Sequence, residues 1–360
     1  MEARTVERER IRGAWEGRIS GCILGKPLEL LSMLKGREAL KSYLEKNQAW
    51  PLRDYVPLAE EPLVQLAGAK SCRGLICRSE PDDDINYTVL ALMMLEAHGR
   101  DLSTSRVADA WLKLLPAGVT YTAERAAYRK LLEITNYSEI IGVPADIDLS
   151  PCSRNEWSEW IGAQIRADLY GWVCPGRPQL AAELARRDAA LSHTGEGIHG
   201  AAFIAALGAA IPASVSLAEA MDAATAEVPS KSAVAEAVAL GRSLAGRADA
   251  VDRLHERYQG LSPVHTVNNL ALVVWGILHG EQDFSAAIGD TVAGGWDTDC
   301  NGATVGGLWG LSGKPVPSQW TAPWRGRVAV NLAGVGELAL DDLAARTFAV
   351  ATKLQGRIRK

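Results

Sequence analysis

The chain has 360 residues, close to the upper limit for one hydrophobic core, and its 48% hydrophobic and 22% charged residues are typical of a globular protein. The formal net charge is −5 and no Lys/Arg cluster occurs, which argues against a nucleic-acid-binding surface. Six cysteines form no CxxC pair and the first twelve residues lack an apolar signal segment, so we expect reduced thiols and a cytoplasmic location.

Two segments at opposite ends of the chain share a spacing of glycines. Glycine recurs at every fourth position in both of them, at Gly13, Gly17, Gly21 and Gly25 and again at Gly302, Gly306 and Gly310. A glycine inside a helix costs up to about 1 kcal/mol relative to alanine, so a bare stripe needs a reason. Ridges with this spacing can interlock, so we predict that helix 6–25 packs directly on the helix after residue 302. The alternative is that these glycines are tolerated by chance.

The first acidic cluster follows an irregular region. A short helix is expected over residues 28–46, and three prolines interrupt residues 30–78: Pro51, Pro57 and Pro62. Asp82, Asp83 and Asp84 then stand directly before an apolar helix predicted over 87–98. Such a triplet is often only a solvated turn, but an acid cluster that opens a buried helix also suits a metal site.

The middle of the chain is predicted to be almost entirely helical. Helices are expected over 105–115, 124–135, 157–170, 179–192, 201–210, 216–226, 232–244, 264–279 and 340–354, and the only modest strand candidate is 328–332. The longest apolar stretches, 201–211 and 270–278, are too short to span a bilayer, so no membrane partner is expected. Helix after helix with short connections predicts an all-α, compact orthogonal multi-helix bundle.

Two polar loops are candidates for substrate binding. The loop 140–158 carries Ser153 and Asn155, and it is either a functional loop or a plain surface connection. The glycine-rich run 192–200 precedes helix 201–210, and a flexible helix N-terminus suits an anion. His193 in this run is the better candidate of its two histidines, although a single histidine is often structural.

The second acidic cluster, residues 294–302, places Asp297 and Asp299 inside glycine-rich backbone before an apolar helix, 303–311. One interpretation is a helix N-cap with a spare acid. However, two carboxylates about 4 Å apart repel by roughly 4 kcal/mol at an effective dielectric of 20. No basic residue lies between residues 284 and 311 to relieve that repulsion. A hard divalent cation with oxygen ligands would relieve it.

Together the two clusters predict one binuclear site. If both helix starts converge, five aspartates surround one cleft, and their charge is nearly balanced by two Mg²⁺ or Mn²⁺ ions but not by one. The predicted metal ligands are Asp82, Asp83, Asp84, Asp297 and Asp299. Cys300 adjoins them, but a thiol is a softer ligand than Mg²⁺ prefers.

These motifs resemble those of the ADP-ribosylglycohydrolase family, which includes enzymes similar to the hydrolase that removes ADP-ribose from dinitrogenase reductase. The family has an early Thr/Ser-Asp-Asp-Thr motif and a late Gly-Asp-Thr-Asp-Thr-Asn motif that bind two Mg²⁺ or Mn²⁺. Residues 21–29 are similar to its N-terminal Gly-Asp-x-x-Gly-x-x-x-Glu segment, and the resemblance spans about residues 10–312. The chain departs from the family pattern at Cys22, Asp82, Ile85, Trp296 and Cys300.

The resemblance implies a single helical domain over residues 1–360, with its core at about 10–312 and a C-terminal extension over 313–360. It implies that Glu29 is the catalytic acid or base and that His193 borders the ADP-ribose pocket. We add Ser153, Asn155, Gly295 and Trp296 as candidate substrate contacts. The expected partner is an ADP-ribosyl or other ribosyl substrate.

The leading hypothesis is a metal-dependent glycosidase that hydrolyses the C1″ bond of such a substrate. The chain contains no P-loop, no GxGxxG motif after a strand, no nucleophile elbow and no HExxH, which argues against several other enzyme classes. Two alternatives stay open. One is a glycosidase of a small nucleoside-like metabolite, and the other is a catalytically silent protein that binds ADP-ribose or metal.

Overall fold

The structure is a computed structural model that describes residues 7–135 and 142–356. Residue 6, where the first helix was expected to begin, and residues 140–141 of the predicted loop lie outside the described residues. The prediction of an all-α fold is confirmed, because the described chain is mainly helical and has one short pair of strands.

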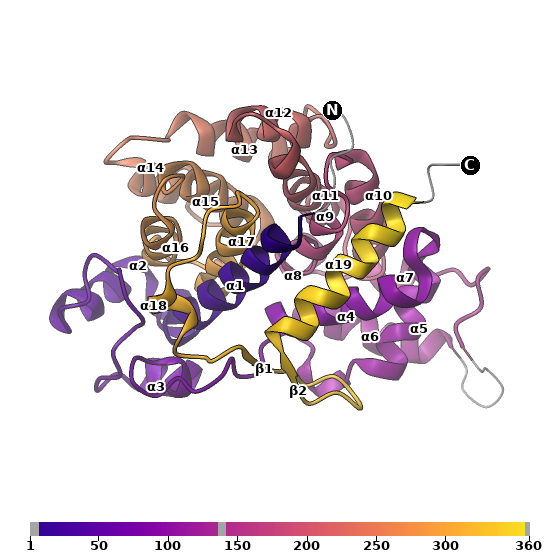
Figure 1. Ribbon diagram of the computed structural model, residues 1–360, viewed down its shortest axis with the longest axis horizontal. Helices are drawn as coiled ribbons and strands as arrows, with labels where there is room; N and C mark the ends of the chain where they lie inside the picture. The colour runs from indigo at the N-terminus through magenta and orange to yellow at the C-terminus, as the bar shows by residue number, and fades with distance from the viewer. Residues whose placement is uncertain (1–6, 136–141, 357–360) are drawn as a thin grey trace.

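The elements follow one another with short connections (Figure 1). The helices are α1 (Arg8–Gly25), α2 (Glu29–Lys46), α3 (Pro62–Gly68), α4 (Asp83–His98), α5 (Thr104–Leu114), α6 (Thr122–Ile134), α7 (Ser150–Ser153), α8 (Gly162–Ile165), α9 (Asp168–Trp172), α10 (Pro178–Ala189), α11 (Gly195–Ala210), α12 (Leu217–Thr225), α13 (Ala233–Ser243), α14 (Ala250–Arg257), α15 (Thr266–His279), α16 (Phe284–Ala293), α17 (Thr298–Gly310), α18 (Ser318–Thr321) and α19 (Leu340–Gly356). Strand β1 (Arg327–Ala329) pairs antiparallel with β2 (Glu337–Ala339). The 3₁₀ turns are η1 (Lys26–Leu28), η2 (Ala69–Ser71), η3 (Gly99–Asp101), η4 (Ala117–Val119) and η5 (Ile211–Ala213).

Helices α1 and α17 form the centre of the molecule and touch through their glycines, as the sequence predicted. A Cβ atom placed on Gly17 would lie 2.0 Å from the carbonyl oxygen of Gly306, and one on Gly21 would lie 1.9 Å from that of Gly302. The contact continues to the end of α1, where a Cβ on Gly25 would lie 2.2 Å from the carbonyl oxygen of Thr298. The missing side chains therefore allow the two backbones to touch over three turns.

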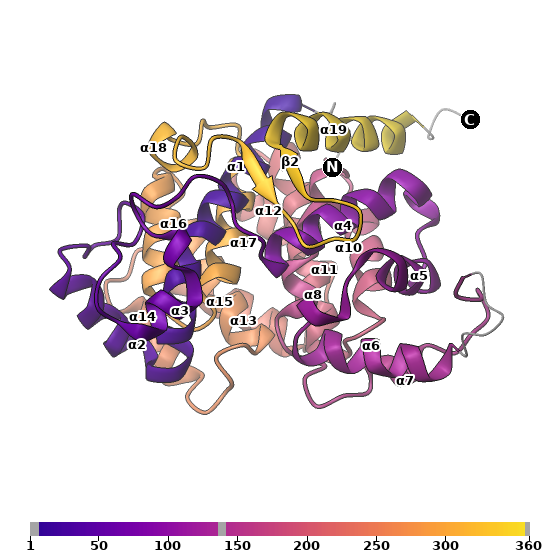
Figure 2. The ribbon, with the colours of Figure 1, turned by 90° about the horizontal axis from the view of Figure 1, so that it is seen from below.

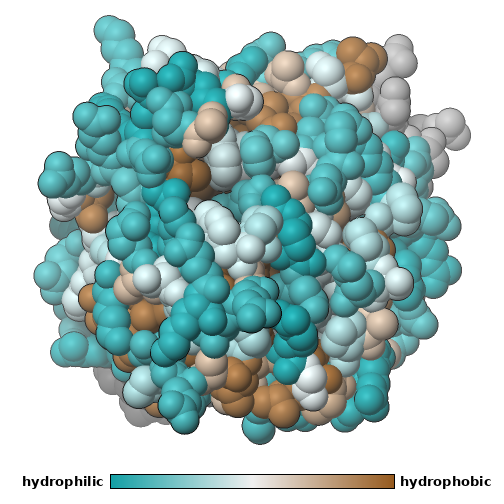
Figure 3. Space-filling model, turned by 90° about the vertical axis from the view of Figure 1, so that its left-hand side faces the viewer, coloured by the Kyte–Doolittle hydropathy of each residue, from teal (hydrophilic) through white to brown (hydrophobic). Residues whose placement is uncertain are grey.

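The other elements surround this central pair. Figure 1 shows α19 running across the front of the molecule beside α1, and Figure 2 shows it along one edge. The indole of Trp15 on α1 donates a 3.0 Å hydrogen bond to Thr347 on α19. Trp320 and Trp324 are also buried, so residues after 312 belong to the same core. The face shown in Figure 3 is mainly hydrophilic, with apolar residues in small separate groups.

Several predicted elements differ in their limits. The helix expected over 157–170 is wrong as one element, because turns separate α8 from α9. Pro62 begins α3 instead of ending a helix, because proline fits the first helical turn. Helix α11 begins at Gly195, so most of the expected glycine-rich loop is helical. The sequence did not predict the helices α3, α7, α14, α16 and α18 or the strand β2.

Helix α11 and the turn after it, residues 195–213, are long and apolar enough by length and composition to cross a membrane. This differs from the expectation that no stretch would be long enough. However, 67% of the apolar window is buried inside the protein. The stretch is therefore accounted for as a core helix.

Replacing Gly17 or Gly306 by alanine should lower the free energy of unfolding by about 1–3 kcal/mol or more, because the new methyl group must push the α1 and α17 backbones apart. Urea denaturation followed by circular dichroism measures the change. Gly118→Ala is the matched control, because a Cβ at Gly118 meets no atom within 4 Å. Equal stability of all three variants would contradict the close backbone contact.

Candidate metal centre

The two acidic motifs meet at one place, although about 210 residues separate them. Ligand atoms of Asp84, Asp299 and Cys300 all lie within 4.8 Å of one another. A second group, Cys22, Asp82 and Asp84, meets the same limit. The groups share Asp84, so they form one continuous cluster. The convergence expected from the sequence is present in the structure.

Helix starts position the acids. Asp82 is the N-cap of α4, and its Oδ1 accepts a 3.0 Å hydrogen bond from the backbone N–H of Asp84. Asp297 occupies the N-cap position of α17. The Thr298 hydroxyl donates a 2.8 Å hydrogen bond to the carbonyl oxygen of Gly25, so the start of α17 is attached to the end of α1. The glycine contact thus sets the distance between the late acids and the N-terminal segment.

A buried arginine on α1, Arg18, pairs with Asp84 of the first acidic cluster. Arg18 is fully buried and donates to Asp84 Oδ1 at 3.1 Å and to Asp168 Oδ2 at 2.9 Å. It also donates to Thr88 and to the carbonyl oxygens of Asp84 and Ile165. Burial raises the pKa of Asp84 well above its usual value, while Arg18 opposes that rise. Arg18 therefore orients Asp84 and leaves its second oxygen, Oδ2, directed elsewhere.

A lysine enters the cluster from the junction of α1 and α2. Lys26 Nζ lies 2.8 Å from Glu29 Oε2, 2.9 Å from Asp82 Oδ2 and 3.1 Å from Asp299 Oδ2. Burial lowers the pKa of this ammonium, but the carboxylates outweigh burial and the pKa is raised. The expectation that no basic residue relieves the repulsion was therefore wrong, because it counted only neighbours in the sequence.

Four buried carboxylate oxygens of the two acidic motifs have no hydrogen bond among the described residues. Asp82 Oδ2 has the Lys26 ammonium at 2.9 Å, whereas Asp84 Oδ2, Asp297 Oδ1 and Asp299 Oδ1 have no such contact. Burial and the adjacent charge of Asp299 raise the pKa of Asp297 well above its usual value. Burial also disfavours ionised Asp299, yet Lys26 and other donors keep its pKa below the usual value. Unpartnered buried oxygens are costly, and a hard divalent cation takes such ligands. These donors therefore fit Mg²⁺ or Mn²⁺.

Asp83 and Cys300 are less clearly placed as ligands. Burial and the charge of Asp82 raise the pKa of Asp83 to about 7. Burial raises the pKa of the Cys300 thiol well above its usual value, which favours a neutral sulfur. Whether either residue is a metal ligand stays a prediction.

Glu29, the first residue of α2, lies beside the cluster through its contact with Lys26. Burial and the charge of Asp299 raise the pKa of Glu29 well above its usual value, while Lys26 lowers it. A carboxyl group with a raised pKa can carry a proton near neutral pH, as a general acid requires. The position is consistent with the role that the resemblance implies.

The loop before α17 is shaped by positive backbone angles. Gly295 has φ 89°, and Trp296, which is not glycine, has φ 58°. The Trp296 ring stacks on His255 at 4.2 Å between centroids and meets Tyr258 edge-on. On α15, the Asn269 side-chain oxygen accepts hydrogen bonds from the Asp297 backbone and from Asn301. Trp296 is thus buried against α14 and the residue that follows it, and supports the loop.

His193 lies in a buried polar network with Glu124, whose charge contributes to the raised pKa of Asp83. Its Nδ1 is 2.8 Å from Ser192 Oγ, and its Nε2 is 3.7 Å from Glu124 Oε1. Burial, together with Arg166, lowers the pKa of His193 well below its usual value, so the ring is neutral. Arg166 joins Glu124 at 2.6 Å and Asp188 at 2.9 Å. Through Arg166, the residue that follows α8, this network connects α6 with α10.

The polar residues of the loop after α6 mainly shape their own backbone. Ser153 Oγ donates to the Ser150 carbonyl oxygen at 3.2 Å. Asn155 donates to the Ser192 carbonyl oxygen at 3.0 Å and accepts from the Trp157 backbone. Asn155 therefore holds this loop against the residue preceding His193. Substrate contact by either side chain stays a prediction.

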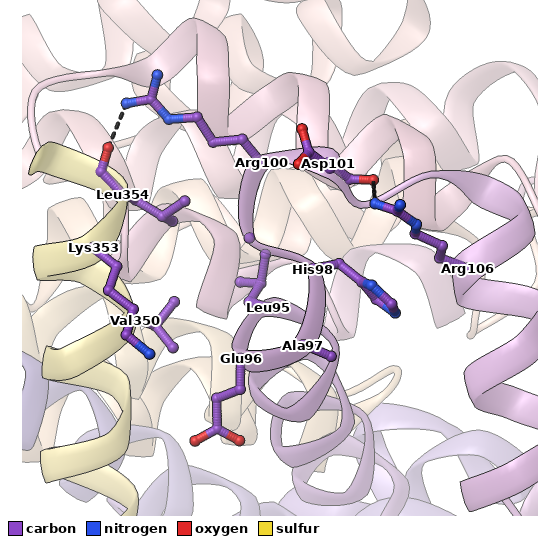
Figure 4. Close-up of a pocket in the computed structure, with 11 residues that line it drawn as sticks. Leu95, Glu96, Ala97, His98, Arg100, Asp101, Arg106, Val350, Lys353 and Leu354 are labelled. Carbon is purple, nitrogen blue, oxygen red and sulfur yellow. Dashed lines mark hydrogen bonds between the residues drawn. The ribbon is translucent and has the colours of Figure 1, made fainter. Parts of the chain in front are cut away.

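One cavity reaches the edge of the acidic cluster at Asp82. It has a volume of about 450 Å³, and its lining includes Cys22, Lys26 and Asp82. Another cavity, of about 430 Å³, lies between the end of α4 and α19 and is lined by residues such as His98, Arg100 and Lys353 (Figure 4). None of its lining residues belongs to either acidic motif. The first cavity is therefore the one connected with the candidate site.

Sequence reasoning missed Arg18, Lys26 and Tyr121. Arg18 could have been noticed as a single charge in an otherwise apolar, glycine-rich helix segment, residues 17–25. Tyr121 lies just before α6 and is 57% exposed. Burial, with the charge of Asp83, raises the pKa of its hydroxyl, which places that hydroxyl within the electrostatic reach of the cluster.

Comparison with known proteins gives a family and a fold. The sequence pattern of the family described as ADP-ribosylglycohydrolase matches residues 3–354. A solved structure described as "ADP-ribosylglycohydrolase-related protein complex" is similar with a TM-score of 0.53, covering 97% of this chain and 100% of that chain at 18% identity. At that identity the likeness concerns the fold alone. No curated protein matches the chain.

Replacing Arg18 by methionine should lower the free energy of unfolding by about 3–5 kcal/mol, because Asp84 and Asp168 would be left buried without their positive partner. Chemical denaturation at neutral pH measures this change. Arg12→Met on the exposed side of α1 is the control; each of its surface ion pairs, with Glu16 and with Asp341, should contribute at most about 1 kcal/mol. Similar losses in both variants would show that Arg18 is not a special support of the cluster.

Proposed function

Because the chain belongs to the ADP-ribosylglycohydrolase family, we propose that it is a divalent-cation-dependent glycosidase that hydrolyses the C1″ bond of an ADP-ribosyl or related ribosyl compound. The observation that carries this proposal is the meeting of both acidic motifs: ligand atoms of Asp84 and Asp299 lie within 4.8 Å of one another, and each of these side chains has a buried oxygen without a hydrogen bond. The family acts on ADP-ribosyl substrates in general; the acceptor group is not specified by these residues.

The donor set supports Mg²⁺ or Mn²⁺ as the cofactor. Asp84, Asp297 and Asp299 would hold the cation through oxygen, and a bound cation would supply charge that binds ribose hydroxyls and lowers the pKa of a water molecule. Arg18 holds Asp84 through Oδ1 and Lys26 holds Asp299 through Oδ2 before the substrate arrives. Such preorganisation is the usual requirement of a metal-assisted site.

We propose Glu29 as the proton-transfer group. Departure of the group attached to C1″ develops oxocarbenium character and requires either a proton on the leaving atom or an activated water. Glu29 lies beside Asp299 and Lys26, and its raised pKa allows it to carry the proton. After departure the carboxylate can accept a proton from the attacking water.

The substrate contacts are proposed from position. His193 lies 3.7 Å from Glu124, and Gly295 and Trp296 directly precede Asp297 in the sequence, so we propose these three residues as substrate contacts. We also keep Ser153 and Asn155 as proposed substrate contacts. Asn155 binds the carbonyl oxygen of Ser192, the residue before His193, and so holds their loop beside His193. We add Tyr121, because an exposed aromatic ring near the acids can stack on a base. A cytoplasmic location is proposed from the free thiols, five of which are buried.

The purified protein with Mg²⁺ or Mn²⁺ should release ADP-ribose or a ribosyl fragment from at least one ADP-ribosylated or ribosyl conjugate. Chromatographic product analysis of Arg-, Ser- and nucleobase-linked substrates measures the release. Asp299→Asn should abolish it, because one negative metal-binding charge is lost while the shape is kept. A wild-type protein that is inert on every linkage would favour the nucleoside-metabolite glycosidase or the silent binder.

Glu29→Gln should lower kcat by about 10²- to 10⁴-fold, because a proton-transfer group is lost. Stabilisation by metal should persist, since Glu29 is not proposed as a primary ligand. Glu45→Gln, at the exposed other end of α2, is the matched control and should keep wild-type turnover. A Glu29→Gln variant that turns over at the wild-type rate would remove Glu29 from the mechanism.

Removing divalent metal with EDTA should lower the melting temperature, and adding Mg²⁺ or Mn²⁺ should restore it. A ligand that binds only the folded state stabilises it by about 2.7 kcal/mol at 100 times its dissociation constant. Differential scanning fluorimetry with EDTA, Mg²⁺ and Mn²⁺ provides the comparison. Identical melting in all three would count against the metal site.

A further inference from the structure

Lys26 is surrounded by three carboxylates, two of which, Asp82 and Asp299, the sequence assigned to metal. Its nitrogen lies between 2.8 and 3.1 Å from one oxygen each of Glu29, Asp82 and Asp299. These oxygens come from three elements: α2, the N-cap of α4 and the first turn of α17. The ammonium group therefore lies among three carboxylates from three elements, as a bound metal ion would lie among its ligands.

The lysine stem is held in place. The residue before it, Gly25, touches the backbone of Thr298, and the Thr298 hydroxyl binds the Gly25 carbonyl oxygen. On the other side, a Cβ on Gly68 would lie 3.1 Å from Lys26 Cγ, so the end of α3 lies against the stem. The Lys26 side chain is 26% exposed. These contacts direct the ammonium towards the acids rather than into solvent.

The Lys26 ammonium makes close ion-pair contacts at this position. Its N···O distances of 2.8, 2.9 and 3.1 Å are at or slightly beyond the about 2.7–2.9 Å of charge-assisted hydrogen bonds. Lys26 neutralises Asp82 Oδ2, which belongs to the ligand group with Cys22 and Asp84. That side of the cluster therefore already has its cation.

On the other side of the cluster Arg18 pairs with Asp84 Oδ1 at 3.1 Å, but three further carboxylate oxygens have no partner among the described residues. Asp299 uses Oδ2 for Lys26 and has no hydrogen-bond partner at Oδ1 among the described residues. Asp84 Oδ2 and Asp297 Oδ1 are unpartnered in the same way. Asp299 can therefore bridge the ammonium on one side and a divalent ion on the other, as a shared carboxylate bridges two metals.

We propose that the Lys26 ammonium fills one of the two cation positions, so that the cleft binds a single divalent cation through Asp84, Asp297 and Asp299. This replaces the binuclear site expected from the sequence and its resemblance. The inference rests on the metal requirement of the proposed function and concerns the number of ions that the cleft holds.

The test is metal stoichiometry with Mn²⁺ as the probe. Protein freed of metal with EDTA is titrated with MnCl₂ by calorimetry, and bound manganese is counted by mass spectrometry after desalting. Wild type should bind one equivalent and give the electron paramagnetic resonance spectrum of an isolated Mn²⁺. Lys26→Met, which keeps the length and loses the charge, should bind two equivalents with a spin-coupled spectrum. Lys35→Met on α2 is the control and should bind one.

Two equivalents in wild type overturn the inference, whatever the variants do. One equivalent in both wild type and Lys26→Met also overturns it, because the ammonium then fills no cation position. No binding by wild type or Lys26→Met contradicts the metal-dependent function itself, which separates the two failures. Lys26→Gln serves in place of Lys26→Met if circular dichroism shows that the methionine variant is unfolded.

Discussion

The contact between the α1 and α17 backbones determines the geometry of the whole site. At Gly17, Gly21 and Gly25, backbone carbonyl groups of α17 occupy the space that a Cβ atom would need. This contact brings the end of α1 to the start of α17, and therefore places Lys26 and Glu29 beside Asp299. The cost of several helical glycines is offset by the short distance between the residues that carry the proposed chemistry.

Burying many acids in one place requires positive charge. The chain supplies it from Arg18 on α1 and from Lys26, the residue that directly follows α1. Arg18 holds Asp84 and Asp168 in the interior, where it is fully buried and makes several hydrogen bonds. Lys26, two turns later, meets the acids at the border of a cavity. The first cation is a structural support that cannot be exchanged without leaving buried charges unpaired. The second stands where an ion could otherwise bind.

The sequence predicted the parts of this protein that depend on local pattern. Apolar periodicity located most long helices, the spacing of glycines predicted the α1–α17 contact, and the acidic runs predicted the convergence of two motifs. It did not predict Lys26 as a partner of Asp82 and Asp299, because a residue 56 positions before the first acid gives no local sign of that contact. Helices α8 and α9 were merged for a similar reason: Arg166, in the turn between them, binds Glu124 and Asp188 on distant parts of the chain, which local composition does not reveal.

Trp296, one of the departures from the family pattern, is accommodated by the residues that pack around it. A bulky residue at Trp296 has a positive φ, a conformation that costs of order 1–3 kcal/mol for residues other than glycine. Stacking on His255, which itself binds the Gly294 carbonyl oxygen at 2.8 Å, and the edge contact with Tyr258 oppose this cost. Residues from α14 and its end thus hold the loop in the shape that directs Asp297 and Asp299 into the cleft. A motif can therefore gain bulk and keep its carboxylates in place when a neighbouring element supports its backbone.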